Sequence, residues 1–248
     1  MTQPPNQLVS SRARVRQRYA MFPLAGYPTS RLPTWPDAEV RVLAAPAMGA
    51  KFVEYMIDMP ANKRGEFAGD DRLETFYYVL SGEGSFGKAK EVRAGSFGLL
   101  PPGHACALHA TGAMRVIVLR KVFERVHGIE PFKPLHGHAS DVPEQTWFDN
   151  PHSRLQLLIP DELQYDMNMN IFTFDPGHGL PYVETHVMEH GLIVLQGEGR
   201  YFLDDEWMDV EKDDFIWMGP YCPQCYLAGG SAPTKYLYYK NVNREIEL

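Results

Sequence analysis

The sequence predicts an all-β protein made of two tandem copies of one small β barrel, and two observations lead to this prediction. Glycines (21) and prolines (20) recur through the 248 residues and separate short apolar and aromatic runs, which is typical of strands joined by turns. The second observation is an internal repeat. Few stretches keep a helical period beyond two turns, so we expect little helix, with at most one turn around 161–164.

The repeat relates the two halves of the chain. Residues 74–84 align with residues 189–199 at a constant offset of 115, since 189 − 74 and 197 − 82 give the same value. Residues 92–97 align with residues 210–215 at an offset of 118, and the three extra residues fit a hairpin loop, where insertions cost little. We therefore expect an N-terminal domain at 1–135 and a C-terminal domain at 136–248, joined within the polar, proline-bearing stretch 131–144.

Charge and hydropathy narrow the range of partners. A formal net charge of −7 argues against nucleic acid and anionic membranes, because both require a basic patch. No segment has the apolar length of a membrane helix or a signal peptide. We therefore expect a cytoplasmic protein that acts on a small molecule. One local exception is a run of arginines at alternate positions, which we interpret as a solvated N-terminal arm: Arg12, Arg14, Arg16 and Arg18.

The cysteine count also excludes some classes of protein. There are three cysteines, Cys106, Cys222 and Cys225. An odd count, with one C-x-x-C pair and no second pair, favours neither a disulfide framework nor a zinc ribbon. A reducing compartment fits this usage best.

The second copy contains a cluster of side chains that can bind metal. Glu184, His186 and His190 fall within seven residues, and positions two apart share one face of a strand. A single histidine in a β sandwich is more often a core residue. Imidazoles and a carboxylate with open positions are, however, what a catalytic divalent metal requires, and three such ligands this close together favour the metal.

The spacing Glu184-x-His186-x3-His190-x6-Gly197 resembles the first cupin motif. The second cupin motif is intact in the first copy, where it ends at Cys106, and degenerate in the second copy, where it ends at Gln224. The resemblance implies a bicupin, with two tandem double-stranded β-helix (jelly-roll) barrels and Gln224 as the fourth ligand. A neutral amide oxygen binds more weakly than imidazole, and the set suits octahedral Mn²⁺ better than tetrahedral Zn²⁺.

The equivalent positions of the first copy lack this donor set. The same offsets lead to Gly69, Asp71, Thr75 and Cys106. None of these four residues supplies an imidazole, so they cannot assemble a metal shell. We expect the N-terminal cupin to be metal-free and to have a structural role.

Three segments, at 165–177, 182–191 and 241–247, resemble the bicupin (S)-ureidoglycine aminohydrolases of purine catabolism. The resemblance extends over most of the chain and implies hydrolytic release of ammonia from (S)-ureidoglycine to give (S)-ureidoglycolate. It also implies a homo-oligomer and Mn²⁺ bound by Glu184, His186, His190 and Gln224. The implied substrate contacts are Glu184, Gln224, Tyr236 and Lys240, with Lys240 as the general base.

The residues support the placement of Lys240 in part. A strand with period two puts Tyr236, Tyr238 and Lys240 on one face, and a desolvated lysine beside a cation has a lowered pKa. Spacing alone would favour a solvated lysine on a terminal strand, and the resemblance reverses that preference. Tyr201 is a weaker candidate, equally explained as a core tyrosine. Two alternatives stay open, an Fe²⁺-dependent bicupin dioxygenase or isomerase and a non-enzymatic binding or storage bicupin.

Overall fold

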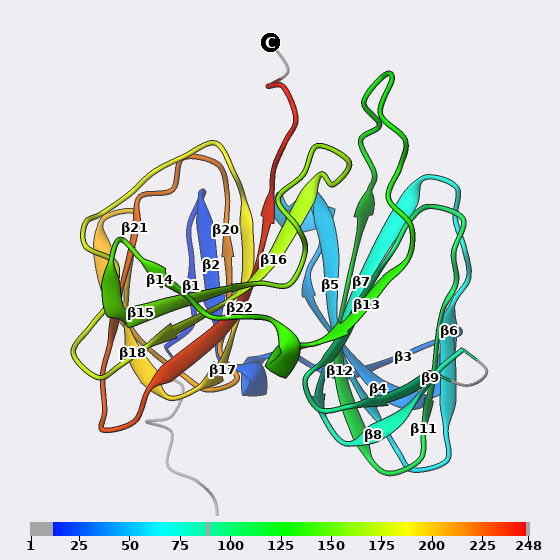
Figure 1. Ribbon diagram of the computed structural model, residues 1–248. Coiled ribbons are helices and arrows are strands. Elements are labelled where there is room, and N and C mark those ends of the chain that lie inside the picture. Colours follow the sequence, from blue (N-terminus) through cyan, green and yellow to red (C-terminus); the bar gives the residue numbers. More distant parts are fainter. Residues whose placement is uncertain (1–11, 88–89, 247–248) are drawn as a thin grey trace, which may run out of the picture.

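The computed structural model describes residues 12–87 and 90–246, which form four antiparallel sheets (Figure 1). Helix in this part of the chain is limited to three 3-10 turns, η1 (Leu24–Gly26), η2 (Pro46–Met48) and η3 (Ala139–Asp141). The segment at 161–164 contains a hydrogen-bonded turn, with Tyr165 N donating to Glu162 O, and no helix. None of the described helices has the length and apolarity needed to span a bilayer.

Two large sheets form the centre of the molecule. In spatial order, the eight-stranded sheet contains β1 (Arg14–Val15), β2 (Tyr19–Phe22), β20 (Phe215–Met218), β17 (His190–Gln196), β22 (Thr234–Asn241), β16 (Met167–Phe174), β15 (Asn150–Leu157) and β14 (Gln145–Trp147). The seven-stranded sheet contains β13 (Leu135–His138), β10 (Ser96–Leu100), β7 (Leu73–Ser81), β12 (Met114–Val122), β5 (Phe52–Met59), β4 (Trp35–Ala44) and β3 (Ser30–Leu32).

Each large sheet is paired with a small one on its outer face. The small sheet of the first half contains β6 (Arg64–Phe67), β11 (Cys106–Ala110), β8 (Glu83–Phe86) and β9 (Lys90–Arg93). The small sheet of the second half contains β19 (Glu206–Glu211), β18 (Glu198–Leu203) and β21 (Gln224–Ala228). One apolar core fills the space between the two sheets of each half, and a third core joins the two large sheets face to face.

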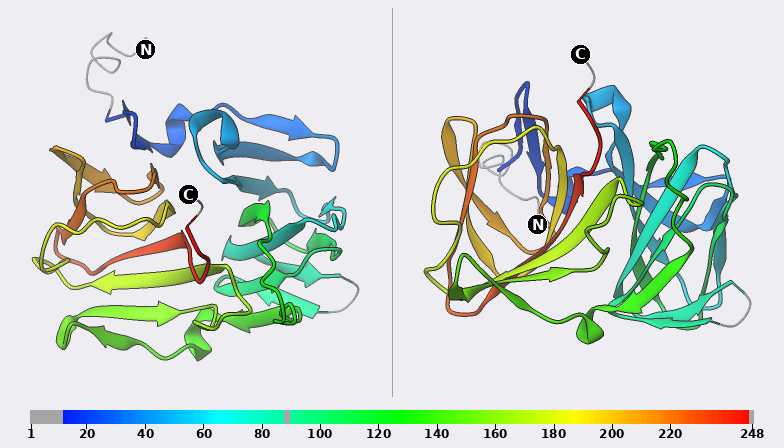
Figure 2. Two further views of the ribbon diagram at one scale, coloured as in Figure 1. Left: turned by 90° about the horizontal axis from the view of Figure 1, so that it is seen from above. Right: turned by 45° about the horizontal axis from the view of Figure 1, so that its top comes forward.

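The order of strands is the same in both large sheets. The series β10-β7-β12-β5-β4-β3 corresponds to β20-β17-β22-β16-β15-β14. The aligned segments at 74–84 and 189–199 start at or next to equivalent strands, β7 and β17. The internal repeat of the sequence therefore has a counterpart in the structure, as the two halves in Figure 2 also show.

The halves exchange their edge strands, which differs from the expected division into 1–135 and 136–248. Strand β2, from the start of the chain, pairs with β20 of the second half, and β13 pairs with β10 of the first half. Figure 2 shows the blue N-terminal strands beside the second half. An open sheet edge exposes unpaired backbone groups, and the exchange covers one edge of each large sheet.

The described part of the arginine-rich arm is ion-paired to the second half, while the side chains of Arg14, Arg16 and Arg18 stay 41–50% exposed, so the expected solvated arm is confirmed only in part. The Arg12 guanidinium is paired with Glu211 at 2.6 Å and also contacts Asp214. Further along the arm, Arg16 pairs with Glu206 at 3.0 Å, and Arg18 pairs with Asp204.

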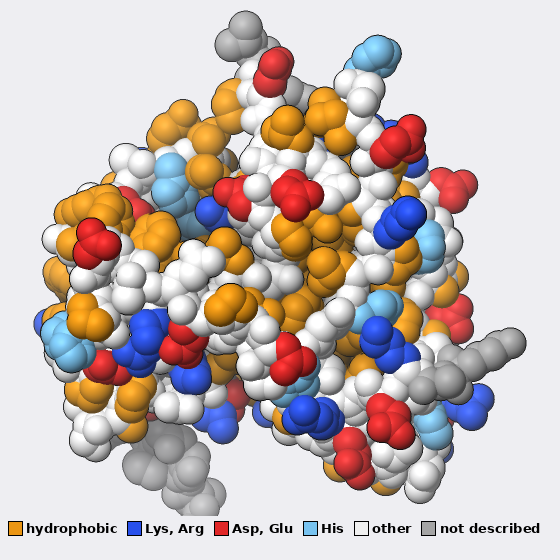
Figure 3. All heavy atoms as spheres, viewed as in Figure 1, with side chains coloured by type: hydrophobic (Ala, Val, Ile, Leu, Met, Phe, Trp, Pro, Cys, Tyr) orange, Lys and Arg blue, Asp and Glu red, His pale blue; other side chains and the backbone are white. Residues whose placement is uncertain are grey.

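On the face drawn in Figure 3, acidic, basic and apolar side chains are interspersed.

A buried charged cluster connects the two halves. Lys121 Nζ donates to Glu74 Oε1 at 3.2 Å and to Asp166 Oδ2 at 2.5 Å, and these side chains are at most 3% exposed. Burial raises the pKa of the Glu74 carboxyl, and its interaction with Asp166 adds to this rise. A proton held by Glu74 beside the Asp166 carboxylate leaves the cluster without net charge, which reduces the cost of burying it.

Candidate active site

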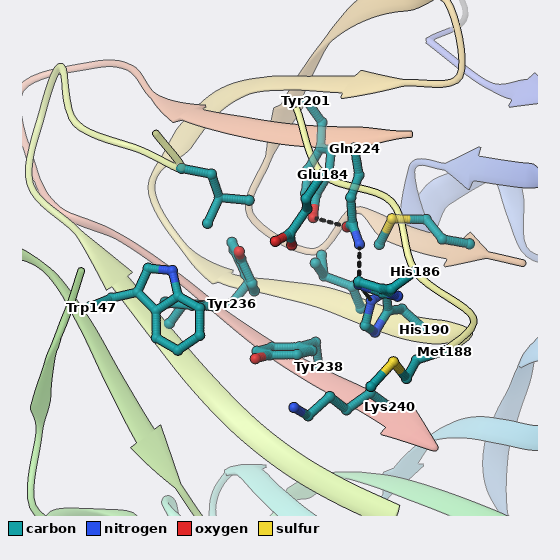
Figure 4. Close-up of a pocket in the computed structure, with 14 residues that line it drawn as sticks. Trp147, Glu184, His186, Met188, His190, Tyr201, Gln224, Tyr236, Tyr238 and Lys240 are labelled. Atoms are coloured by element: carbon teal, nitrogen blue, oxygen red, sulfur yellow. Dashed lines mark hydrogen bonds between the residues drawn. The ribbon is translucent and has the colours of Figure 1, made fainter. Parts of the chain in front are cut away.

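A pocket of about 130 Å³ lies inside the second half. Its walls come from strands of both sheets and from the segment 180–188 that precedes β17 (Figure 4). The side chains that line it are mainly aromatic, apolar and metal-competent: Trp147, Phe172, Leu180, Glu184, His186, Met188, His190, Leu192, Tyr201, Met218, Gln224, Tyr236, Tyr238 and Lys240. Every predicted site residue therefore lines one cavity.

The two histidines point at each other in this pocket. His190 Nδ1 lies 2.9 Å from the carbonyl oxygen of Tyr239, and a carbonyl can only accept, so Nδ1 carries the proton and Nε2 presents a lone pair. His190 Nε2 is 3.3 Å from His186 Nε2. Two nitrogens bound to one metal at right angles would be about 3 Å apart for bonds near 2.1 Å. The separation of the imidazoles thus suits a shared cation.

Gln224 lies next to this pair. Its Nε2 is 3.0 Å from His186 Nε2, and its Oε1 accepts from the Tyr201 hydroxyl at 3.1 Å. If Gln224 donates to His186 Nε2, this nitrogen and His190 Nε2 face each other as two lone pairs, which a cation between them would relieve. Tyr201, the weaker sequence candidate, donates its hydroxyl hydrogen to the Gln224 amide oxygen and so holds this side chain in the pocket.

Glu184 belongs to the same pocket but stands apart from the imidazoles. Its backbone exchanges two hydrogen bonds of 2.9 Å with Gln224, which ties the segment before β17 to β21. Burial raises the pKa of its carboxyl, opposed by His186 and Lys240. Among the described residues, no three His, Cys, Asp or Glu side chains gather closely enough to hold a metal. The structure thus brings together two histidines and Gln224, while the Glu184 carboxylate reaches the cavity separately (Figure 4).

The strand register places Lys240 beside the histidines. On neighbouring strands, Lys240 of β22 is directly opposite His190 of β17, so their side chains project from the same face. Tyr236 and Tyr238 follow on that face, as period two predicts, and both line the pocket. Lys240 is therefore a pocket residue and not the solvated lysine that spacing alone would favour.

The pocket shifts the protonation of its basic groups. Burial, with a further contribution from His186, lowers the pKa of His190 to about 3, which keeps this imidazole neutral and able to bind a metal. Burial also lowers the pKa of the Lys240 amine, while Asp161 and Glu184 act in the opposite direction. A larger share of Lys240 is consequently neutral near pH 7 than for a lysine in water, which suits a group that accepts protons.

The sequence did not identify Trp147 as a pocket residue. Trp147 ends β14 at the edge of the large sheet, and its ring packs edge-on against Phe172 at 5.4 Å between centroids. The next two residues, Phe148 and Asp149, have φ values of 51° and 55°, which turn the chain back into β15. No motif signals this position, because the contact depends on a turn with two left-handed residues that are not glycine.

The corresponding region of the first half is filled by side chains. Trp35 is fully buried there and packs on Phe67 at 5.3 Å, and Thr75 Oγ1 accepts from Arg120 Nε at 3.3 Å. Burial raises the pKa of the Cys106 thiol to about 12, which disfavours the thiolate that a metal would need. That this half is metal-free stays a prediction. All three cysteines are free, buried thiols.

Comparison with known proteins relates this architecture to one family. A family model described as a cupin domain matches residues 170–239. The chain is 32% identical to the (S)-ureidoglycine aminohydrolase of Escherichia coli (strain K12) over 97% of this chain and 95% of that one. The Arabidopsis thaliana (S)-ureidoglycine aminohydrolase is 29% identical over 94% and 79%. A crystal structure of the E. coli protein Ylba is similar with a TM-score of 0.85, 32% identity and coverage of 99% and 100%. With this identity over nearly its whole length, the chain belongs to the (S)-ureidoglycine aminohydrolase family and contains a cupin domain.

Proposed function

We propose that this protein is a metal-dependent (S)-ureidoglycine aminohydrolase, which hydrolyses a C–N bond and releases ammonia. The observation that carries the proposal is the pocket that combines two facing imidazoles and the Gln224 amide with Lys240 on the adjacent strand. A chain of this family needs such a site to bind a small, polar substrate and to move protons on it. The pocket's volume of about 130 Å³ suits a substrate of this size.

The residues that would hold the metal are His186, His190, Gln224 and Glu184. Their donors are two imidazoles, an amide oxygen and a carboxylate, a mixed N and O set that, with water completing an octahedral shell, suits Mn²⁺ better than tetrahedral Zn²⁺. When bound, the metal would supply a Lewis acid that anchors the substrate carboxylate and a neighbouring heteroatom. Glu184 and Gln224, which are also on the pocket wall, would contact the substrate as well.

The remaining chemistry falls to Lys240. In the overall reaction the bond between Cα and the amine nitrogen breaks, and a bond forms between Cα and the oxygen of water. Lys240, whose pKa burial lowers, would accept a proton from that water and return a proton to the departing amine, so that ammonia leaves. Tyr236 and Tyr238, on the same face of β22, would limit which side of Cα meets Lys240 and so select one enantiomer.

We also propose that the two halves are two cupins, so that the chain is a bicupin. The support is the strand order that occurs twice in the large sheets, each covered by its own small sheet. By resemblance, the enzyme would work as a homo-oligomer in the cytoplasm, with a small-molecule substrate and neither nucleic acid nor membrane as partner.

The proposal is tested by metal analysis together with ammonia release from freshly generated (S)-ureidoglycine. We expect about one Mn²⁺ per chain and turnover that is lost after chelation and restored by Mn²⁺. Oxygen consumption with a requirement for Fe²⁺ would instead indicate a dioxygenase. A pure, folded protein that holds no metal and releases no ammonia would indicate a binding or storage bicupin.

A further inference from the structure

Strand β16 carries two buried asparagines whose role the site described above does not explain. All eight residues of this strand, Met-Asn-Met-Asn-Ile-Phe-Thr-Phe, are buried. Met167, Met169 and Ile171 belong to the core between the two large sheets. Because side chains alternate along a strand, Asn168 and Asn170 face the interior of the second half, on the same side as Phe172, which lines the pocket.

The register of the sheet places each asparagine beside a pocket residue. Asn168 is directly opposite Lys240, which is itself opposite His190, so the three residues form one row across β16, β22 and β17. In the next row, Asn170 is opposite Tyr238. Directly opposed residues have Cβ atoms about 4.5–5.5 Å apart. A short amide side chain can therefore reach the side chain of its partner in the row.

The asparagines have hydrogen-bonding capacity that the fold does not use. Asn168 is 1% exposed and its Oδ1 has no partner, and the Asn170 amide is fully buried with neither atom in a hydrogen bond of ordinary geometry. Buried polar groups without partners are rare and unfavourable. The Asn170 amide nevertheless interacts with the Tyr238 hydroxyl and opposes the rise in its pKa that burial causes. Lys240, directly opposite Asn168 on β22, carries three N–H groups and could supply the donor that Asn168 Oδ1 lacks.

The first half shows that the fold itself does not require asparagine at these positions. Its equivalent row is Thr75, Arg120 and Val53, so an apolar residue takes the place of Asn168. There, Arg120 is held by Thr75 and by the ring of Phe67, 4.7 Å from the guanidinium carbon. Tyr55 takes the place of Asn170. The two amides thus occur only in the half that contains the pocket.

We propose that Asn168 is a positioning residue, whose side-chain carbonyl accepts a hydrogen bond from Lys240 Nζ and holds the amine toward the reacting carbon. This inference rests on the proposed function, because it assigns Lys240 the proton transfers of that reaction. Asn168 does not touch the substrate and acts through Lys240. Its loss should therefore reduce turnover and leave substrate binding and metal content nearly unchanged.

The kinetic test is a double-mutant cycle on the Mn²⁺-loaded enzyme. Asn168→Leu should lower kcat about 10- to 100-fold, the effect of misplacing a reacting group by about 1 Å, with KM changed less than about threefold. In a Lys240→Met background the same substitution should cause no further loss, because residues that act as a unit are not additive. Asn168→Gln, which keeps a neutral side-chain carbonyl as acceptor, should retain more of the turnover than Asn168→Leu. Losses that multiply in the double variant, or an unchanged kcat in Asn168→Leu, would overturn the proposal.

A matched control comes from the same strand. Thr173 is 2% exposed and its hydroxyl has no partner, but its side chain faces the core between the two large sheets and not the pocket. Thr173→Val should leave kcat and KM unchanged. Where Asn168→Leu lowers the melting temperature, the crystal structure of the wild-type Mn²⁺ form decides. The distance from Asn168 Oδ1 to Lys240 Nζ should be about 2.7–3.2 Å, and a distance beyond about 4 Å would refute the proposal. This measurement needs no substrate, so an enzyme inactive on ureidoglycine would refute the proposed function separately.

Discussion

Glu54 of β5 is a buried carboxyl that should make stability depend on pH. Its side chain is 1% exposed, its Oε2 has no hydrogen-bond partner, and it lies behind Gly191, where an added Cβ would come within 2.4 Å of that oxygen. Burial raises its pKa to about 8. The folded protein therefore keeps a proton on Glu54 over a pH range in which the unfolded chain has lost it.

The magnitude follows from this difference. Below about pH 4.5 both states hold the proton, and Glu54 contributes no pH dependence. Between about pH 4.5 and pH 8 only the unfolded state releases it, so the free energy of unfolding falls as pH rises. The shift from 4.5 to about 8 is 3.5 units, and at about 1.36 kcal/mol per unit it corresponds to roughly 5 kcal/mol. Replacing Glu54 with Gln removes the titration and should remove this loss.

Urea unfolding of wild type and Glu54→Gln at pH 5 and pH 9 measures the effect. The variant should gain about 3–5 kcal/mol relative to wild type between these two values. Glu39→Gln, on the exposed face of neighbouring β4, serves as the control and should give the same difference at both pH values. Parallel pH profiles for wild type and Glu54→Gln would refute the inference that the buried carboxyl stays protonated.

The other predictions concern the site. His186→Ala and His190→Ala should abolish Mn²⁺ binding, measured by elemental analysis, whereas Gln224→Ala should weaken it less, because water can replace a neutral ligand; full metal retention in either histidine variant contradicts the assignment. Lys240→Met should keep fold and metal and lose about two to four orders of magnitude in turnover; near-normal ammonia release would make it a bystander. Cys106→Ser should leave ammonia release unchanged, and elemental analysis should still find one metal per chain. A second metal per chain would show that the prediction of a metal-free first half is wrong.

The strand repeat was predictable from sequence because it depends on local patterns. Short apolar runs between turn residues, and glycines at matching offsets, predict both copies of the sheet. The exchange of edge strands was not predictable in this way. It depends on contacts such as Tyr19 with Met218, almost 200 residues apart, and no local pattern specifies which free edge a short strand will join.

The site was predictable where residue types are unusual and not where they are ordinary. His186 and His190 were predicted from imidazoles at cupin spacing, whereas Lys240 was predicted from the family resemblance, because strand spacing alone favoured a solvated lysine; the structure places all three in one pocket. Glu184 was expected among the ligands, and the structure places it in the pocket without drawing its carboxylate to the imidazoles. Asn168 carried no signal, because a polar residue at alternate positions is what any half-exposed strand shows. Only its burial and its register reveal its position beside Lys240.

The difference between the halves lies in side chains on a shared frame. Equivalent rows hold Thr75, Arg120 and Val53 in the first half, and His190, Lys240 and Asn168 in the second. In the first half, Trp35 also fills the interior so tightly that a Cβ on Gly65 would lie 2.0 Å from its ring. The backbone pairing that puts three residues in one row is common to both halves, so the chemistry must follow from which side chains occupy the row and from the space left above it.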